Sequence, residues 1–261
     1  MTSQPGPGGV SLAIDGGVAV VTIDRPAVRN AIGFATTSEL DAAISDVAAA
    51  DAAVLVLTGG GDRAFVSGGD LKELAAVRTH AEAVQMASNV RDVLDHLAAL
   101  PMPVIAAMNG HALGGGAEVA VAADIRIAAN DIRIGFSQVD LGIMPAWGGI
   151  ERLTGLVGRA RALLAITSGT QYDATAAHEI GLVDLVVPRA TFDAEWRALA
   201  AKLAGLAPGT TRAVKEVVSA TRPAVHPSSR DRAIDLFATL WAAPEHWAAV
   251  DAATTRRAVK K

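Results

Sequence analysis

One carboxylate stands alone in an apolar, glycine-rich part of the chain. Residues 114–125 read GGGAEVAVAADI, and from Pro103 to Ala123 Glu118 is the only ionisable residue apart from His111. Desolvation in an apolar cleft raises the pKa of a carboxyl group, while a helix N-terminus opposes that rise. The result is a group able to exchange a proton near neutral pH, so Glu118 is a candidate general acid or base. The alternative is a structural glutamate satisfied by a neighbouring donor.

Two glycine-rich loops each lead from a strand-like run into a helix-like run. They read FVSGGDLKEL (65–74) and NGHALGGGAEV (109–119). The unpaired N–H groups at the start of a helix stabilise an anion or a developing oxyanion, and glycine lets a ligand approach them closely. Ordinary turns are the alternative, but the same arrangement in two consecutive units favours function. Neither loop fits a nucleotide-binding motif, and no G-x-S-x-G surrounds Ser67, which makes it a poor candidate nucleophile.

Strands and helices alternate around these loops. Gly16-Gly17 predicts a hairpin with strands near 10–14 and 18–23. Further strands are expected in 52–61, 103–110 and 181–188, with a short strand pair in 126–131 and 132–137. Helices are expected over 36–50, 70–100, 117–125, 149–166 and 174–180, and over almost everything after Thr191. This alternation implies an α/β fold with a mainly parallel sheet.

Length and composition set limits on the organisation of the chain. Its 261 residues, of which 51% are apolar and 19% charged, suit one large domain or one domain with a helical appendage, with disorder confined at most to the ends. The turn formers in MTSQPGPGG predict a flexible arm at 1–9, and the change to helical sequence after about residue 190 divides a core domain at 10–190 from a helical region at 191–261. A net charge of −4 argues against a broad nucleic-acid surface, and no apolar run is long enough for a membrane span. The absence of cysteine excludes disulfides and cysteine-ligated metal, and the scattered histidines suggest no metal site. A cytoplasmic location is expected.

Four motifs, taken in this order, resemble the enoyl-CoA hydratase/isomerase (crotonase) superfamily. They are DRPAVRNAI, AFVSGGDLKEL, MNGHALGGGAEVAVAADIRIA and GLVDLVV, and the resemblance runs from about Ser11 to Lys261. It implies an α/β crotonase (ClpP-like) fold of repeated ββα units, with a C-terminal helical trimerisation region. A homotrimer or a dimer of trimers is therefore expected. The spacing of the C-terminal helices is equally compatible with packing inside one chain.

The resemblance also implies roles for individual residues. In the family, two backbone N–H groups hold the thioester oxygen of an acyl-CoA, and here they would belong to Gly69 and Gly115, with Glu118 as acid/base. Coenzyme A is part of the substrate, so no separate cofactor is expected. The residues implied in substrate binding are Arg25, Arg29, Ala31, Ser67, Gly68, Asp70, Leu71, Gly114, Pro145 and Trp147. The two arginines would lie near the CoA phosphates, unless they belong to a solvated turn.

At one position the chain departs from the family pattern. Gln138 stands where family hydratases carry a second catalytic glutamate, and an amide can form hydrogen bonds but cannot take a proton. Asp140 would share the face of Gln138 in a strand-like segment and could then substitute. Ala146 excludes the family's dienoyl-CoA isomerases and aromatic dehalogenases, which carry a reactive aspartate there. Hydration of a 2-enoyl-CoA, a lyase reaction, is the first prediction.

Two other functions fit the same residues. GIMPAWGG resembles a stretch of the ethylmalonyl-CoA decarboxylases, which keep the Glu118 position and lack the second glutamate. Loss of CO₂ from an ethylmalonyl or methylmalonyl thioester generates the enolate without a base, so an oxyanion hole and one proton donor suffice. A non-catalytic acyl-CoA-binding homologue would keep the glycine loops without turnover.

Overall fold

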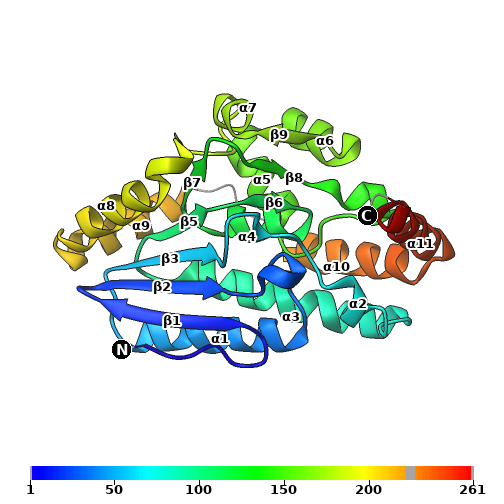
Figure 1. The fold of residues 1–261 in the computed structure, drawn as a ribbon, viewed down its shortest axis with the longest axis horizontal. Helices are drawn as coiled ribbons and strands as arrows, with labels where there is room; N and C mark the ends of the chain where they lie inside the picture. The colour runs from blue at the N-terminus through cyan, green and yellow to red at the C-terminus, as the bar shows by residue number, and fades with distance from the viewer. Residues whose placement is uncertain (1, 222–226, 260–261) are drawn as a thin grey trace.

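The computed structural model describes residues 2–221 and 227–259 and contains two β-sheets (Figure 1). The six-stranded sheet has the order β1-β2-β3-β5-β7-β10, and the four-stranded sheet has the order β4-β6-β8-β9. The strands are β1 (Val10–Asp15), β2 (Val18–Ile23), β3 (Val54–Gly59), β4 (Ala64–Val66), β5 (Val104–Met108), β6 (His111–Leu113), β7 (Ile125–Ala129), β8 (Arg133–Gly135), β9 (Gln171–Asp173) and β10 (Leu185–Val187). Only β1–β2 and β8–β9 pair antiparallel, so the expected mainly parallel arrangement is confirmed.

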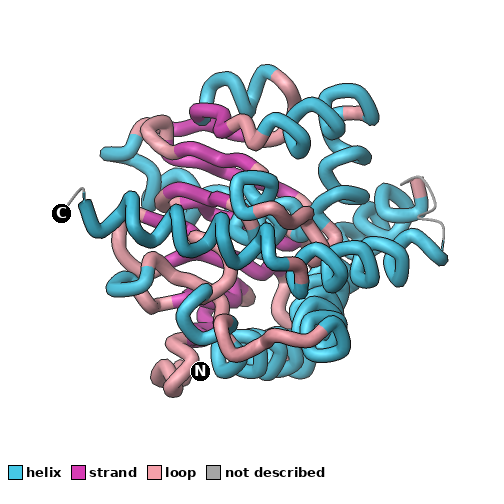
Figure 2. Tube along the Cα trace, turned by 90° about the vertical axis from the view of Figure 1, so that its right-hand side faces the viewer, coloured by secondary structure: helices cyan, strands magenta, loops and turns pink. Residues whose placement is uncertain are grey.

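Helices surround both sheets. The α-helices are α1 (Phe34–Ala49), α2 (Leu71–Leu74), α3 (His80–Ala99), α4 (Gly115–Ala122), α5 (Gly149–Val157), α6 (Arg159–Ser168), α7 (Ala174–Glu179), α8 (Phe192–Ala204), α9 (Pro208–Ala220), α10 (Pro227–Ala242) and α11 (Pro244–Val259). Three short 3-10 helices are η1 (Pro26–Val28), η2 (Ser137–Leu141) and η3 (Arg189–Thr191). Seen from the side of α10 and α11, the strands lie side by side in the interior with helices around them (Figure 2).

The six-stranded sheet is buried because helices pack against it. Every residue of β3 and β5 is buried, as their continuous apolar sequences predict. The helix α1 packs against β1, β2 and α3, while α8 packs against β2, β3 and β7. In Figure 1, α1 lies below β1 and β2. All eight residues of α4 are buried among α3, α5 and the strands β4 to β6, which explains why this helix is apolar on every side except at Glu118.

The two ends of the chain are tied to the core. In the N-terminal arm, Ser3 donates its N–H to Leu12 O, and Gly8 donates its N–H to the carboxylate of Glu39 on α1. The flexibility predicted for residues 1–9 stays a prediction. At the other end, α10 packs on α3 and α11 packs on η2 of the same chain, with the indole of Trp241 donating to Val77 O. This packing is the intramolecular alternative, and assembly into trimers stays a prediction.

One detail of the expected secondary structure is wrong. The strands β7 and β8 are adjacent in sequence but do not pair, because β7 belongs to the large sheet and β8 to the small one. The stretch 70–100 is mostly helical as expected and consists of α2 and α3, where Thr79 and Glu82 form a capping box that starts α3. The helical stretch expected over 149–166 consists of α5 and α6, which are divided at Gly158, whose φ of 80° breaks the helical path.

Candidate active site

Glu118 lies in the first turn of α4 with 2% of its surface exposed. Its Oε1 accepts hydrogen bonds from the N–H groups of Trp147 (2.8 Å) and Gly149 (3.0 Å), and its Oε2 accepts one from Gln138 Nε2 (3.0 Å). Burial raises the pKa of Glu118 to about 7, while these three donors and the positive charge of Arg152 pull it downward. The carboxyl group can therefore both release and accept a proton near neutral pH.

Gln138 lies in η2, with its side chain buried beside Glu118. Its Nε2 is bound to the carboxylate, but its buried Oε1 has no hydrogen-bond partner among the residues that the structure describes. Such an orphaned acceptor is costly unless a ligand or water uses it. The expectation that Asp140 shares this face is wrong, because the segment is a 3-10 helix that leaves Asp140 exposed while Gln138 is buried.

Gly69 and Gly115 each present a backbone N–H without an acceptor in the described parts of the chain. Gly69 is bridged to Ile32, because Ile32 donates its N–H to Gly68 O and accepts one from Asp70 N, both at 2.8 Å. A parallel bridge of this kind leaves the Gly69 N–H on the side away from Ile32. Gly115 is the first residue of α4, where an N–H has no intrahelical partner. The two predicted oxyanion donors are thus available to a ligand.

The indole of Trp147 closes the space beside these glycines. A Cβ atom at Gly115 would lie 2.1 Å from Cζ3 of Trp147, and one at Gly69 would lie 3.8 Å from Cη2 of the same ring. Trp147 is 6% exposed and lines a pocket of about 550 Å³ between α1 and α3. Leu74, Met86 and Val90 add apolar walls, and polar side chains such as Asp41 and His96 line another part of this pocket, which is called the apolar pocket below for the side chains near the glycines. Apolar side chains next to the glycine pair make this pocket suited to an acyl group.

A second pocket, of about 360 Å³, carries positive charge. Its lining includes Arg29, Arg63 and Arg189, against two aspartates, Asp62 and Asp131. Asp131 pairs with Arg189 at 2.5 Å. The remaining charges are Arg29 and Arg63 against Asp62, so the lining has an excess of positive charge. Guanidinium groups bind phosphates well.

Each glycine loop runs from the basic pocket to the apolar one. Ser67 and Leu113 line the basic pocket. Two residues further along each loop, Gly69 and Gly115 contact the Trp147 ring that lines the apolar pocket. A group bound between Gly69 and Gly115 would therefore have the pocket lined by arginines on one side and the pocket lined by Trp147 on the other.

Several predicted substrate-binding residues have structural contacts. Arg25 pairs with Asp70 (3.1 Å) and donates to Ala31 O (2.5 Å), so its guanidinium joins the first glycine loop to the preceding turn and lies outside both pockets. Leu71 begins α2, and Pro145 is buried ahead of Trp147. Gly68 (φ 102°) and Gly114 (φ 57°) adopt backbone angles that favour glycine. Ligand contacts of all these residues stay predictions.

Sequence reasoning missed some of the residues that build the site. Gly149 supplies an N–H to Glu118, and a Cβ atom there would lie 2.5 Å from Glu118 Cγ. The Gly148-Gly149 pair before a helix was the available signal. Met86 and Val90 of α3 gave no signal beyond helical spacing, and Arg63 gave none beyond its charge.

The described residues contain neither a cluster suited to a metal ion nor a membrane-spanning helix. Over residues 2–221 and 227–259, no cluster of three or more His, Asp or Glu side chains is placed to hold a metal ion. No helix in that part of the chain is long and apolar enough to cross a membrane.

Comparison with known proteins finds consistent relatives. The family model described as enoyl-CoA hydratase/isomerase matches residues 13–253. The chain is 37% identical over 211 residues to a short-chain-enoyl-CoA hydratase of Clostridium acetobutylicum, covering 80% of each chain. It is 40% identical over 207 residues to a probable enoyl-CoA hydratase of Rhodobacter capsulatus, covering 79% of each. The crystal structure of an enoyl-CoA hydratase from Bacillus anthracis superposes with a TM-score of 0.78 at 35% identity, covering 81% of this chain and 82% of that one.

Proposed function

The chain belongs to the enoyl-CoA hydratase/isomerase family, and from this premise we propose that it is an enoyl-CoA hydratase, a lyase that adds water reversibly to a 2-enoyl-CoA. One observation carries the proposal: the loops that hold Gly69 and Gly115 run from a pocket lined by arginines toward Trp147, which lines the second pocket. An acyl-CoA has the same polarity, with phosphates on one side of its thioester and hydrocarbon on the other.

Binding follows from this polarity. The CoA phosphates would lie near Arg29 and Arg63, and the acyl group would enter the pocket lined by Trp147 and Val90. The thioester oxygen would then accept hydrogen bonds from the two glycine N–H groups. Donors that are already oriented when charge develops contribute about 3–4 kcal/mol each in the transition state. Addition of water involves no net oxidation or reduction, so the reaction requires no separate cofactor.

Glu118 supplies the proton transfers. Its carboxylate takes a proton from a water molecule, whose oxygen bonds to C3 of the enoyl group. The π electrons of the C2–C3 double bond move toward the thioester oxygen, where the glycine N–H groups stabilise the enolate. Glu118 then gives its proton to C2, and the thioester carbonyl forms again. A pKa of about 7 suits both steps. The unpartnered Oε1 of Gln138 can accept a hydrogen bond from the second hydrogen of the water and so help to orient it.

The single carboxylate of this site also favours a second candidate function, decarboxylation. Because Gln138 occupies the place beside Glu118 and Asp140 is exposed, the site holds one buried acid where two are expected for hydration. Decarboxylation of an ethylmalonyl-CoA or methylmalonyl-CoA needs the enolate-stabilising glycines and one proton donor. The identity to relatives named as hydratases keeps hydration first.

One pair of assays tests the proposal. The protein is incubated with crotonyl-CoA while the absorbance of the conjugated thioester is followed, and separately with ethylmalonyl-CoA while CO₂ is measured. Loss of the conjugated absorbance that requires Glu118, and so disappears in Glu118→Gln, is the expected result. Release of CO₂ without hydration would replace the proposal with the decarboxylase. Binding of both thioesters without turnover would leave an acyl-CoA-binding protein.

We also propose that the chain assembles as a homotrimer or a dimer of trimers. Exposed apolar side chains on α6 and α9 support an interface there, namely Leu163, Leu164, Val214, Val217 and Val218. Light scattering coupled to size-exclusion chromatography measures the mass, and a monomer at micromolar concentration would contradict assembly. A cytoplasmic location stays a prediction from the sequence.

A further inference from the structure

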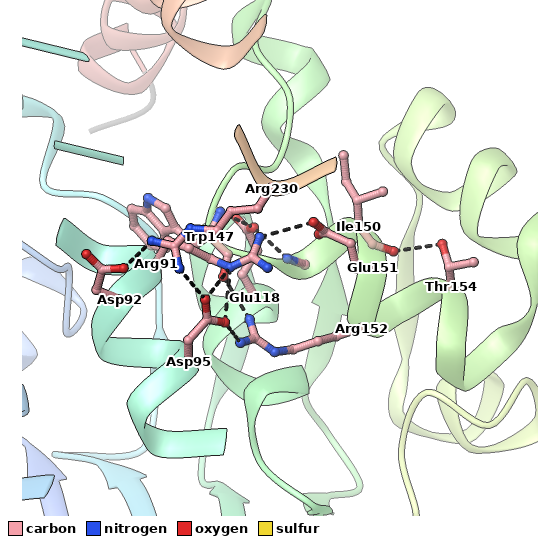
Figure 3. A network of polar contacts seen from close by, with 11 residues as sticks. Arg91, Asp92, Asp95, Glu118, Trp147, Ile150, Glu151, Arg152, Thr154 and Arg230 are labelled. Carbon is pink, nitrogen blue, oxygen red and sulfur yellow. Dashed lines mark hydrogen bonds and ion pairs between the residues drawn. The ribbon is translucent and has the colours of Figure 1, made fainter. Parts of the chain in front are cut away.

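A cluster of arginines and carboxylates, in which Arg91 is buried and Asp95 half-buried, lies next to the segment that binds Glu118 (Figure 3). Its centre is Asp95 on α3, whose carboxylate accepts from Arg91 Nε (2.9 Å), Arg152 Nη2 (2.5 Å) and Arg230 Nη1 (3.1 Å). These three arginines come from α3, α5 and α10. Arg91 also pairs with Glu151 at 3.1 Å. One carboxylate therefore joins three helices that surround the site.

Arg152 is the member of this cluster that reaches the active site. Its Nη1 donates to Trp147 O at 2.8 Å, and its own N–H bonds to Gly148 O at 3.2 Å. Trp147 and Gly149 are the residues whose N–H groups bind Glu118 Oε1. Arg152 thus binds the carbonyl oxygen of Trp147, which lies in the chain between the N–H groups of Trp147 and Gly149. The 147–149 segment therefore links the Arg152 guanidinium to the Glu118 carboxylate through hydrogen bonds.

Packing around Gly148 keeps this segment in place. The residue has a φ of 91°, and a Cβ atom there would lie 2.2 Å from Arg152 Nη1 and 2.9 Å from Arg91 Cζ. The two guanidinium groups therefore pack directly against the backbone at Gly148, where no side chain fits. The geometry leaves the segment little freedom while Arg152 remains bound to Asp95.

We propose that Arg152 is a positioning residue for Glu118: bound to Asp95, it fixes the 147–149 segment so that both N–H groups reach Oε1, and it sets a buried positive charge beside the acid. The inference rests on the proposed function for the role of Glu118. The alternative is that Arg152 only joins α3 to α5. In that case its loss would destabilise the fold and leave the titration of Glu118 unchanged.

The charges around Glu118 determine what the loss of Arg152 does. The elements packed around α4 carry the following titratable or charged groups. They are Glu151 and Arg152 on α5, Arg91 and Asp95 on α3, Arg230 on α10, the exposed Asp140 on η2, and His111 on β6, which lines the basic pocket. Burial raises the pKa of Glu118, and the bonds from Gly149, Trp147 and Gln138 and the charge of Arg152 lower it. Removing Arg152 takes away the charge and loosens two of those bonds, so the pKa should rise.

The experiment measures the titration of Glu118 directly in the full-length protein. Glutamate is labelled with ¹³C at the carboxyl carbon, and the Glu118 signal is assigned by its absence in Glu118→Gln. Arg152→Gln is compared with Arg230→Gln, which removes another cation that is bound to Asp95 but makes no hydrogen bond to the 147–149 segment. The midpoint should rise in Arg152→Gln by roughly one pH unit, as expected for loss of a nearby opposite charge, and stay unchanged in Arg230→Gln.

An unchanged midpoint in Arg152→Gln, or an equal rise in Arg230→Gln, would overturn the positioning role. If Arg152→Gln does not fold, Arg152→Lys decides: an ammonium cannot reproduce the planar fork, so a midpoint and a kcat equal to those of the wild type would overturn the role. The titration needs no turnover. A wild-type protein that hydrates no 2-enoyl-CoA would refute the proposed function, while the carboxyl titration would still decide the role of Arg152.

Discussion

The indole ring of Trp147 lies against the backbone of Gly115, with Cζ3 only 2.1 Å from the position that a Cβ atom would occupy there. The same ring lies 3.8 Å from the Cβ position at Gly69, so one aromatic side chain lies beside both proposed oxyanion donors. Its own backbone N–H binds Glu118. Trp147 therefore connects the three proposed parts of the reaction centre, namely both N–H donors and the acid/base.

A methyl group at Gly115 should disable the site. In Gly115→Ala the new Cβ must displace the Trp147 ring or the start of α4, and we expect kcat for crotonyl-CoA to fall by about 10²–10³, the effect of losing one oxyanion donor. Gly155→Ala on α5 is the matched control, because nothing lies within 4 Å of its Cβ position. Steady-state kinetics on both variants make the comparison. Full activity of Gly115→Ala would contradict the assigned contact.

The burial of Glu118 should make the stability of the fold depend on pH. Because the pKa is about 7 in the folded protein against 4.5 for the exposed group, the folded protein binds the extra proton between these values and loses stability as pH rises. The shift corresponds to about 3 kcal/mol. Urea unfolding at about pH 5 and about pH 8 should show the wild type losing about 3 kcal/mol more than Glu118→Gln, which has no proton to release. Equal losses would refute the raised pKa.

Sequence patterns predicted those parts of the fold that depend on local order. The continuous apolar runs of β3 and β5, the hairpin at Gly16-Gly17 and the apolar α4 all form as expected. The partner of a strand is a long-range property, and for that reason β7 and β8 could be predicted as strands but not assigned to different sheets. The two-sheet arrangement became visible only in the structure.

In the candidate site, too, the residues that depend on local sequence could be predicted, and the contacts between distant segments could not. Glu118 and the glycines were recognisable from residue type and spacing, whereas the environment of Glu118 depends on Arg152 and Asp95, which come from distant helices. For Asp140, a wrong prediction of the local secondary structure led to a wrong prediction of the side-chain position. A strand would place it beside Gln138, but the 3-10 helix there turns it to the surface.

A second carboxylate at position 138 should accelerate hydration. Gln138→Glu places a carboxyl group within hydrogen-bonding distance of Glu118, where two like charges share one proton and titrate as a pair. The protonated member can then protonate C2 while the other activates water, and we expect kcat to rise by about tenfold or more, given that such groups contribute ~10²–10⁴. Asp140→Asn, an exposed change on the same 3-10 helix, should have no effect. An unchanged or lower kcat would mean that the pocket is shaped for a different reaction.

The basic pocket should affect the binding of CoA and not the chemistry. For Arg29→Ala combined with Arg63→Ala, we expect KM for crotonyl-CoA to rise a few-fold, since exposed charge contacts contribute about 0.2–1 kcal/mol each, with kcat unchanged. The pantetheine thioester, which lacks the nucleotide phosphates, should show no such rise. Arg232→Ala on the exposed part of α10 serves as the control. Equal effects on both thioesters would place the CoA elsewhere.

Narrowing the apolar pocket should discriminate between acyl chains. Val90 is 7% exposed and lines the pocket that leads from Trp147 between α1 and α3, so Val90→Phe fills space that a longer chain would occupy. Each methylene removed from the pocket forfeits about 0.8 kcal/mol, so kcat/KM for a ten-carbon enoyl-CoA should fall by at least about tenfold while that for crotonyl-CoA changes little. Leu206→Phe, at a 47% exposed position just after α8, is the control for adding a bulky side chain outside the pocket and outside the proposed interface. If both chain lengths lose kcat/KM equally in Val90→Phe, the acyl group does not enter this pocket.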